Sequence, residues 1–382
     1  MNLVPSYLGF LFSFTLIYLF ANLYIARRTW RQLAWPLCRR RLFCTALSVA
    51  ALLYPAGRIV EALSGAGTFS YLLTLCGAYW LAATFYLFWL IALGDLLRFL
   101  LALSGRPLPF APRRLAAGQW LLMFLLVGYG AYNASQPVLK NYELRIAKAA
   151  PTQSELRIAM VSDIHLGSLI GVSQLTPIVE RINALKPDLV LLPGDIIDGP
   201  VAVLADGRLC AEFRRLEAPL GVYGCMGNHE YTDRQPEEFI RYMKEANVMI
   251  LRDEIRLINN NFYLAGRDDL SAQRFRNQER QPLSELLQNI DAAKPLLLLD
   301  HQPKSFAEAV QNSVDLQLSG HTHLGQLFPN QLITALLYQL DYGYLSIDRF
   351  QAVVSCGIGT WGPPVRLGNR PEIVLLTIHF KP

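Results

Sequence analysis

Two kinds of hydrophobic pattern divide the chain. Its first third contains long, nearly uncharged apolar stretches, whereas the remainder contains short apolar runs that end in polar residues. Long uninterrupted runs are typical of membrane-spanning helices, and runs of about four to eight residues are typical of buried strands. The pattern therefore predicts a membrane region followed by an α/β domain.

Four apolar stretches in the first part are long enough to consider as membrane spans: residues 3–26, 42–57, 69–94 and 115–139. A helix needs about 20 apolar residues to cross the hydrocarbon core. The second stretch reaches that length only if it extends to Leu63, with Arg58 and Glu61 paired or turned to the membrane surface. The first lacks a basic leader and a small-residue cleavage pattern, so we expect an uncleaved helix. The sequence predicts a membrane domain over residues 1–139 with about four spanning helices.

Composition supports a membrane protein. Hydrophobic residues make up 52% of the chain and charged residues 17%, which is too apolar for an ordinary soluble protein. Residues 1–135 contain eleven Arg, no Lys and two acidic residues, a net charge of +9, whereas the rest of the chain has a net charge of −4. These arginines interrupt apolar runs and do not line one polar face. They therefore indicate a membrane surface, and we expect no nucleic-acid partner.

The loop arginines predict the orientation of the chain. They lie after the first and third predicted helices, and the N-terminus and the loop at residues 64–68 have none. The ten residues are Arg27, Arg28, Arg31, Arg39, Arg40, Arg41, Arg98, Arg106, Arg113 and Arg114. Cytoplasmic loops retain Lys and Arg. With four helices, the domain after Pro137 then lies on the outer face of the membrane, and a helix count wrong by one reverses this placement.

The remainder of the chain alternates strand-like and helix-like patterns. Strands are predicted at residues 156–161, 188–192, 221–226, 295–299, 314–318, 348–356 and 372–380. Helices are predicted at residues 173–185, 206–216, 235–246, 283–293 and 304–311. This order predicts an α/β domain over residues 156–382, with sheets wrapped by helices. The polar stretch at 140–155 is interpreted as a linker or a first edge strand.

Five polar motifs follow five of the predicted strands, and they hold five of the six histidines. They are Asp163-Ile164-His165, Gly194-Asp195-Ile196-Ile197-Asp198, Gly227-Asn228-His229-Glu230, Asp300-His301 and Gly320-His321-Thr322-His323. Loops at the carboxyl ends of strands are where α/β sheets bind ligands. Carboxylate, imidazole and amide oxygen are ligands for divalent cations, and a shared Asp can hold two of them about 3.5–4 Å apart.

The order of these motifs resembles the calcineurin-like metallophosphoesterase superfamily, from about residue 156 to the C-terminus. The stretches Gly320-His321-Thr322-His323-Leu324-Gly325-Gln326 and Gly359-Thr360-Trp361-Gly362-Pro363-Pro364-Val365-Arg366-Leu367-Gly368 further resemble its membrane-associated bacterial branch. The resemblance implies a four-layer α/β/β/α sandwich after the transmembrane helices, and a metal-dependent phosphoric ester hydrolase. It also implies a location in the bacterial inner (plasma) membrane. The arginine pattern described above then predicts the catalytic domain on the periplasmic or extracellular face.

The resemblance also implies roles for single residues. Asp163, His165 and His323 would hold one divalent cation, and Asn228, His301 and His321 the other. Asp195 would bridge them, and His229 would be the general acid. The cations would be Mn, Fe or Zn, and a bridging water would supply the hydroxide. Asp198 or Glu230 would orient the His229 ring.

Several further residues are open to two interpretations. We expect Asp300 to cap the following helix, with orientation of His301 as the alternative. Arg267 and Arg366 are expected in surface ion pairs, with a contact to substrate phosphate as the alternative. Cys225 is expected in the core and not as a nucleophile.

The segment 331–340 has leucines at helical spacing, which by default indicates core packing. The alternative is an apolar wall beside the metals, or a helix that enters the bilayer. The expected function is therefore a membrane-anchored two-metal phosphoesterase, acting on a phosphoester or pyrophosphate bond of a lipid-linked substrate. Two other functions stay open: a tethered phosphodiesterase or phosphatase for soluble nucleotides or phosphoproteins, and a non-catalytic membrane sensor.

Overall fold

A computed structural model describes residues 4–65, 67–107, 109–276, 279–304 and 306–381. The predicted helix start at Leu3 lies outside these residues. The chain divides into two compact units. A helical unit comprises Met1–Tyr132 and Gly362–Val365, and an α/β unit comprises Asn133–Trp361 and Arg366–Pro382.

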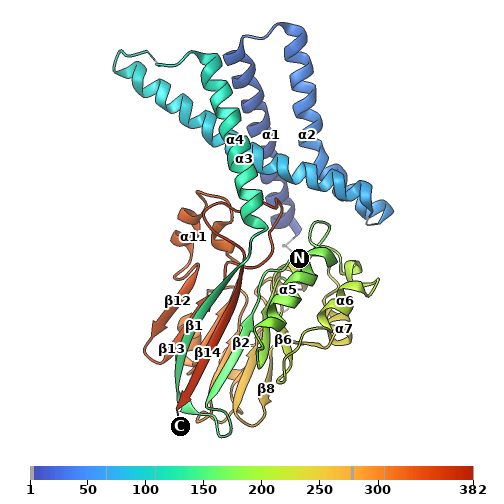
Figure 1. The fold of residues 1–382 in the computed structure, drawn as a ribbon, viewed down its shortest axis with the longest axis vertical. Helices are drawn as coiled ribbons and strands as arrows, with labels where there is room; N and C mark the ends of the chain where they lie inside the picture. Colours follow the sequence, from blue (N-terminus) through green and yellow to red (C-terminus); the bar gives the residue numbers. More distant parts are fainter. Residues whose placement is uncertain (1–3, 66, 108, 277–278, 305, 382) are drawn as a thin grey trace. The chain divides into compact units, whose positions relative to one another are not determined.

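Long helices build the helical unit: α1 (Val4–Leu33), α2 (Leu37–Ser64), α3 (Thr68–Leu103) and α4 (Pro112–Ala134) (Figure 1). Within the described residues, α2, α3 and α4 are long and apolar enough to cross a membrane. These three helices indicate an integral membrane protein. The fourth predicted span, in α1, is present as a helix, and its crossing of the membrane stays a prediction.

Local chemistry bears on the length of two of these helices, α2 and α4. In α2, Arg58 Nη1 pairs with Glu61 Oε2 at 3.0 Å, which is the pairing that a longer second span requires. The last apolar stretch was expected to stay helical to Leu139, and this is wrong because α4 ends at Ala134. Pro137 disfavours a helical conformation in the residue before it, so the chain leaves the helix and enters a strand.

The first sheet of the α/β unit has the strand order β1-β14-β2-β4-β6-β7. Its strands are β1 (Val138–Ala149), β2 (Glu155–Met160), β4 (Leu189–Pro193), β6 (Val222–Cys225), β7 (Val248–Leu251) and β14 (Glu372–Lys381). Strands β2, β4, β6 and β7 are parallel, and β14 is antiparallel to β2. The carboxyl ends of β2, β4 and β6 therefore meet at one end of the sheet.

The stretch at 140–155, expected as a linker or a first edge strand, contains the edge strand. β1 pairs in parallel with β14, from Val138 opposite Glu372 to Ile146 opposite Phe380. Only residues 150–154 connect β1 to β2. The polar side chains of this stretch fit an edge strand, whose outer face contacts solvent.

The second sheet has the order β12-β13-β11-β10-β9-β8. Its strands are β8 (Glu254–Ile258), β9 (Phe262–Gly266), β10 (Leu296–Leu299), β11 (Leu316–Ser319), β12 (Gly343–Ile347) and β13 (Phe350–Val354). The four inner strands are parallel, and β8 and β12 are antiparallel edges. The β8–β9 hairpin has no counterpart in the prediction. Its turn places Asn259 and Asn260 at φ 43° and 59°, a conformation that Asn tolerates.

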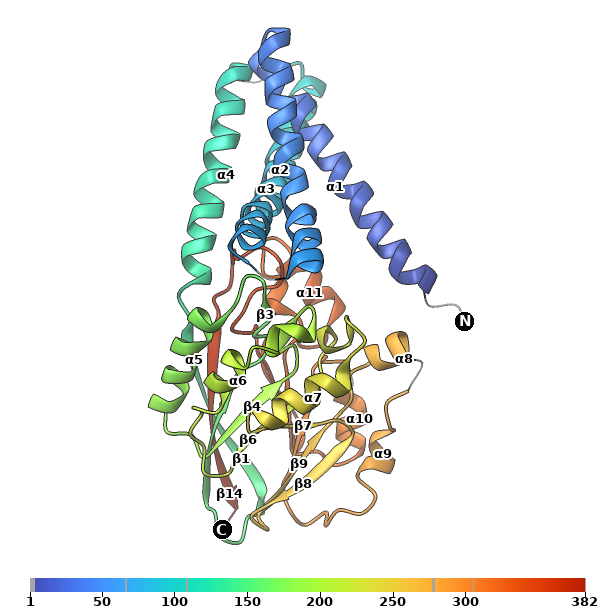
Figure 2. The ribbon, with the colours of Figure 1, turned by 90° about the vertical axis from the view of Figure 1, so that its right-hand side faces the viewer.

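Two layers of helices cover the two sheets. Helices α5 (Val172–Ala184), α6 (Arg208–Phe213) and α7 (Pro236–Glu245) lie over the first sheet, and α9 (Leu283–Leu286) and α10 (Phe306–Gln311) over the second (Figure 2). Alternate residues of β2 show the layering: Ile158 and Met160 are buried between the sheets, and Ala159 is buried under α5–α7. The predicted four-layer sandwich is confirmed.

Short elements lie in the loops between these layers. They are β3 (Leu166–Gly167), β5 (Ile197–Asp198), α8 (Ser271–Arg276), α11 (Gln331–Leu337) and the 3₁₀ turns η1 (Val201–Leu204), η2 (His229–Tyr231) and η3 (His323–Gly325). Several of them follow the strands whose carboxyl ends meet, and these loops form the site.

Candidate metal centre

The predicted site residues come together from both sheets. Asp163 and His165 follow β2, Asp195 follows β4, and Asn228 and His229 follow β6. His301 follows β10, and His321 and His323 follow β11. The two sheets pack face to face, so the carboxyl ends of their inner strands open onto one site.

The site backbone is strained. Five of the predicted ligands have positive φ without being glycine: Asp163, His165, Asp195, His321 and His323 at 53°, 55°, 51°, 75° and 49°. This conformation costs about 1–3 kcal/mol for each residue and persists only where the surrounding fold enforces it. Such strain is characteristic of functional sites.

Close packing enforces these conformations. A Cβ atom at Gly320 would lie 2.2 Å from Asp163 Oδ2, and one at Gly227 would lie 2.2 Å from Asp195 Oδ1. No side chain fits in either place. The Gly before Asn228 and the Gly before His321 are therefore required for the two carboxylates to sit where they do.

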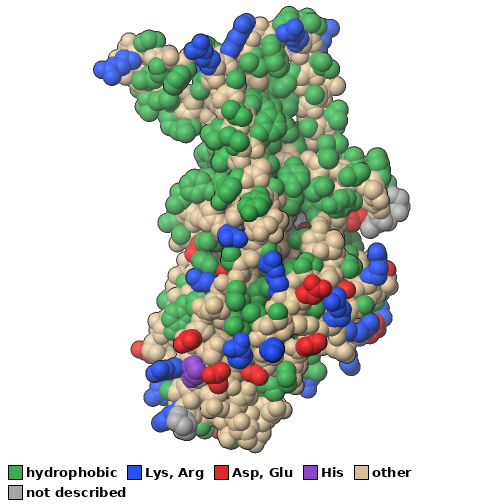
Figure 3. All heavy atoms as spheres, in the orientation of Figure 1, with side chains coloured by type: hydrophobic (Ala, Val, Ile, Leu, Met, Phe, Trp, Pro, Cys, Tyr) green, Lys and Arg blue, Asp and Glu red, His purple; other side chains and the backbone are tan. Residues whose placement is uncertain are grey.

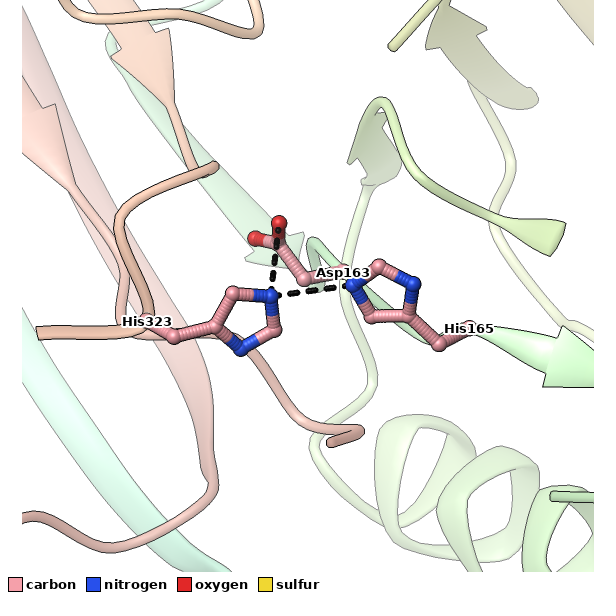
Figure 4. Close-up of side chains that lie close together, drawn as sticks. All are labelled: Asp163, His165 and His323. Atoms are coloured by element: carbon pink, nitrogen blue, oxygen red, sulfur yellow. Dashed lines mark hydrogen bonds and ion pairs between the residues drawn. The ribbon is translucent and has the colours of Figure 1, made fainter. Parts of the chain in front are cut away.

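Asp163, His165 and His323 form the first cluster (Figure 4). His165 Nε2 lies 2.9 Å from His323 Nε2, and His323 Nε2 lies 3.5 Å from Asp163 Oδ1. All three side chains are buried. Two imidazole nitrogens and a carboxylate oxygen facing one another are the donor set of a divalent cation.

Asp195, His301 and His321 form the second cluster, with Asn228 beside it. His301 Nε2 lies 3.1 Å from Asp195 Oδ2, and His321 Nδ1 lies 2.8 Å from Asn228 Oδ1. His301 Nδ1 lies 2.8 Å from the carbonyl oxygen of Pro193. The carbonyl can only accept, so Nδ1 donates to it and Nε2 is directed at the cluster.

Asp195 lies between the two clusters. Its Oδ2 is 3.9 Å from His165 Nε2, on the side of the first cluster, and also 3.9 Å from His229 Nε2. It forms one possible metal-binding group with His165 and His229, and another with His301 and His321. This position is the one a bridging carboxylate needs.

His229 is oriented by Asp198. Its Nδ1 lies 2.8 Å from Asp198 Oδ1, and its backbone N–H donates to Asp195 Oδ1 at 2.9 Å. Burial alone would lower the pKa of His229, but Asp195 and then Asp198 raise it to about 9. The two carboxylates therefore favour the protonated ring, which is the form that can donate a proton.

Glu230, the other residue considered for orienting His229, has a different function. Its buried carboxylate accepts hydrogen bonds from the backbone N–H groups of Asp195, Ile196, Ile197 and Gly227. It thereby fastens the loop after β4 to the loop after β6. This role depends on how close the two loops lie in the folded chain, and the sequence spacing of the motifs does not reveal that distance.

Burial keeps three of the site imidazoles neutral. It lowers the pKa of His165 to about 4 and that of His321 to about 3, and it holds the pKa of His323 well below its usual range. Neutral imidazole is the form that binds a metal ion. For His301, burial also acts against the charge, but the adjacent Asp195 carboxylate raises its pKa. A dication would replace that proton.

The expectation for Asp300 is wrong. Within the described residues, its carboxylate accepts no hydrogen bond from α10. It accepts two hydrogen bonds from Arg280 Nη1, at 3.0 and 3.1 Å. Both groups are in the interior, where an unpaired charge is costly. Arg280 is 20 residues away in sequence, and no spacing rule points to it.

The two arginines expected at the surface are both buried. Arg267 Nη1 pairs with Glu308 Oε2 at 2.6 Å. Arg366 donates to backbone carbonyls, among them Cys356 O at 2.9 Å. Cys225 is buried as expected, and burial raises the pKa of its thiol, which disfavours a nucleophilic thiolate.

Helix α11 is exposed, and the default interpretation of core packing is wrong. None of its described residues is buried. After it, the Tyr338 ring packs edge-on against the His321 ring with a centroid distance of 6.1 Å. The sequence indicated the helix but could not show which way its leucines face.

Comparisons with known proteins agree with this geometry. The family model of the calcineurin-like phosphoesterases matches residues 156–325. An uncharacterized metallophosphoesterase from Aquifex aeolicus is 34% identical over 267 residues, which cover 68% of this chain and 99% of that protein. The chain belongs to the calcineurin-like metallophosphoesterase family. It is a metal-dependent phosphoesterase with apolar N-terminal helices.

Another relative is a transmembrane protein with a metallophosphoesterase domain from Danio rerio. It is 32% identical over 270 residues, 68% of this chain and 61% of that protein, so the chain spans less than two thirds of this relative. A crystal structure of a dimetal phosphatase from Danio rerio aligns with a TM-score of 0.35 and 13% identity, over 55% of this chain and 89% of that one.

The residues present fit a pair of metal ions. Among the described side chains, His165 Nδ1 is a buried nitrogen without a hydrogen-bond partner, and His301 Nε2 makes no aligned hydrogen bond, although Asp195 Oδ2 lies 3.1 Å away. A buried polar atom left unpaired is costly, and at His301 Nε2 a metal would remove that cost. The His and Asp clusters are thus consistent with the dimetal site typical of the family.

Proposed function

We propose that the protein is a membrane-anchored two-metal phosphoesterase that hydrolyses a phosphoester or pyrophosphate bond of a lipid-linked substrate. The first cluster would hold one divalent cation, and His301, His321 and Asn228 the other, with Asp195 between them. The cations would be Mn, Fe or Zn. Two such ions polarise phosphoryl oxygens and lower the pKa of a shared water toward neutrality.

His229 is the general acid of this proposal. Asp198 holds Nδ1, so Nε2 faces the site and its side chain keeps 15% exposure toward an incoming substrate. In its protonated state it can give a proton to the leaving oxygen, or a hydrogen bond to an equatorial phosphoryl oxygen. Asp163 is a poorer candidate for the general acid, because it is buried and its carboxylate accepts a hydrogen bond from the His321 backbone N–H at 2.9 Å.

The observation that supports a lipid-linked substrate is the surface of α11. Its apolar side chains Leu332, Ile333, Leu336 and Leu337 are 64%, 55%, 87% and 71% exposed. Soluble proteins rarely expose a contiguous apolar face of this kind unless it binds a partner or a membrane. In a chain with three helices able to cross a membrane, acyl chains are a fitting partner for it.

Asp341 links helix α11 to the loop that contains His321 and His323. Thr322 Oγ1, between His321 and His323, donates to the carbonyl oxygen of Asp341 at 2.5 Å. Thr334 Oγ1 of α11 donates to Asp341 Oδ2 at 2.7 Å. A lipid whose chains rest on α11 would thus have its phosphate beside the second cluster.

The arginines support a location of the α/β unit outside the cytoplasm. The α1–α2 and α3–α4 connections lie at one end of the helical unit and the α2–α3 connection at the other (Figure 1). Figure 3 shows basic side chains at the first end and hydrophobic side chains along the helices. Cytoplasmic loops retain arginine, so α4 would lead outward. Digestion of the α/β unit by protease added to intact spheroplasts tests this, and full protection would contradict it.

The lipid proposal predicts a selective defect. Replacing Leu336 and Leu337 by Ser should lower turnover of a lipid phosphoester in membranes by about tenfold or more, since each leucine loses about 1.5 kcal/mol or more of contact with acyl chains. Turnover of a small chromogenic phosphodiester should stay unchanged. Both rates are measured on the full chain, together with its melting temperature.

The control is Leu257→Ser, which replaces an exposed leucine of β8. It should change neither rate. Equal turnover of the lipid by the double variant would favour a tethered enzyme for soluble nucleotides or phosphoproteins. No turnover of any phosphoester by the metal-loaded wild type would favour a membrane sensor.

A further inference from the structure

Arg366 is a fully buried guanidinium at the edge of the first cluster. It lies in the glycine-rich loop after β13, and the proposed chemistry does not use it. Its Nη2 lies 2.9 Å from Cys356 O, 3.1 Å from Gly357 O and 3.3 Å from His323 Nδ1. The contact with His323 is the feature that needs an explanation.

Carbonyl groups already use the hydrogens of this nitrogen. Nη2 has two hydrogens, and its neighbours include the carbonyl oxygens of Cys356, Gly357 and Gly359. Nothing requires Nη2 to donate to the imidazole as well. Asn369 holds both partners in place: its Oδ1 accepts from Arg366 Nη1 at 3.1 Å, and its Nδ2 donates to His323 O at 2.9 Å.

Arg366 also differs from Arg267, the other buried arginine near the site, in how its positive charge is neutralised. Arg267 pairs with the Glu308 carboxylate. Within the part of the chain that the structure describes, Arg366 forms no ion pair with a carboxylate, and its partners are carbonyl and amide oxygens. Its positive charge is therefore left to act on its surroundings, in an interior where charge is weakly screened.

The charge of Arg366 lies next to one particular nitrogen of His323, which is Nδ1. Nε2 faces Asp163 and His165, so Nε2 is the nitrogen that would bind a cation, and in that state Nδ1 would have the proton of the neutral ring. A metal-bound histidine usually donates this proton to a carboxylate or carbonyl, which makes the ring a stronger ligand. His301 does so, toward Pro193 O at 2.8 Å. His323 instead faces a guanidinium, which has no acceptor atom.

We infer that Arg366 lowers the affinity of the first cluster for its cation, and so makes the two metal positions unequal. The guanidinium, 3.3 Å from Nδ1, opposes the positive charge that a bound cation would place on the His323 ring. A cation bound by poorer donors keeps more of its power to polarise an oxygen ligand. The inference rests on the proposed ligand assignment, and Arg366 acts through His323 as a positioning and tuning residue.

Replacing the charged guanidinium of Arg366 by a neutral amide tests this inference. The full chain in detergent is stripped with a chelator and titrated with Mn²⁺, and free Mn²⁺ is followed by its magnetic resonance signal. Arg366→Gln should tighten one of the two binding steps about tenfold, the lower end of what such partners of metal ligands contribute. Arg366→Lys, which keeps the charge, should stay closer to wild type.

Three further variants make the result specific. His323→Ala should remove the step that Arg366→Gln tightens, and removal of that step by His301→Ala would overturn the inference. Arg370→Gln is the control, because this exposed arginine donates, among the described residues, to the backbone carbonyl of Gln136, and it should change neither step. An unchanged or weaker step in Arg366→Gln would also overturn the inference. Absence of Mn²⁺ binding by the wild type would instead contradict the proposed function.

A measurement on the wild type covers the case in which Arg366→Gln does not fold. The chain has six histidines, so a ¹⁵N-histidine spectrum of the Zn²⁺-loaded protein is simple. The Nδ1–H of His301 should show the downfield shift of a hydrogen-bonded proton, and that of His323 should not. A hydrogen-bonded shift at His323 Nδ1–H would show an acceptor there and overturn the inference.

Discussion

The two clusters differ in how open they are. Every member of the first cluster is buried, whereas Asn228 and His321 beside the second are only partly buried. The Tyr338 ring also packs against His321 of the second cluster, whereas the partly buried His229 lies against His165 of the first, with a ring-centroid distance of 4.7 Å. The difference teaches that solvent reaches the second cluster through His321 and Asn228, whereas the first cluster is shielded from solvent.

They also differ in backbone conformation. All three residues of the first cluster are left-handed, whereas in the second cluster Asp195 and His321 are left-handed and His301 is not. Both clusters are closely packed: a Cβ atom at Gly359 would lie 2.1 Å from Ile164 O, and one at Gly194 would lie 2.6 Å from His301 Nδ1.

Asp195→Asn removes the group that both clusters share, and we expect the largest effect from it. The neutral amide cannot offset the charge of two dications, so both should bind weakly and turnover should fall to background. Metal content per chain and phosphoester turnover are measured on the same preparation. Retention of two cations by this variant would contradict the shared role of Asp195.

His229→Ala removes a side chain that lies beside the first cluster without being one of the proposed ligands. Metal content should stay at the wild-type level, and kcat should fall by about 10²–10⁴-fold, which is the usual contribution of a general acid. The comparison with Asp195→Asn separates proton transfer from metal binding. If His229→Ala lost metal as readily as Asp195→Asn, His229 would be a ligand and not the acid.

Asp198→Asn should have the smallest effect of the three. It weakens the hydrogen bond that orients the His229 ring, and a loss of about tenfold in kcat is expected, with both cations retained. Because Asp198 acts through His229, adding this change to His229→Ala should lower the rate no further. A further loss in the double variant would show a separate role for Asp198.

The site was predictable because its chemistry lies in short motifs after buried strands. Leu156 and the apolar residues after it predict β2, and the strand then places Asp163 and His165 at a known end of the sheet. This inference needs only local sequence and the rule that parallel strands share one open end. It yields the residues of the site but not their distances.

The remainder depends on contacts between distant segments. Nothing near Asp300 announces Arg280, and Glu230 could not be told from Asp198 as the partner of His229, because both are acidic and lie in the motifs. The leucines of α11 have the spacing of a buried helix and are exposed. Periodicity specifies that one face is apolar, but not what covers that face.

Strand β1 also determines where the α/β unit can be separated from its membrane helices. The family match starts at residue 156, after β1 has ended. Cutting there would expose one whole side of β14, a strand of 10 residues, and leave its backbone N–H and C=O groups unpaired. Open edges of this length recruit other strands and promote aggregation. A soluble fragment should therefore begin before Val138, so that its sheet keeps the strand that closes it.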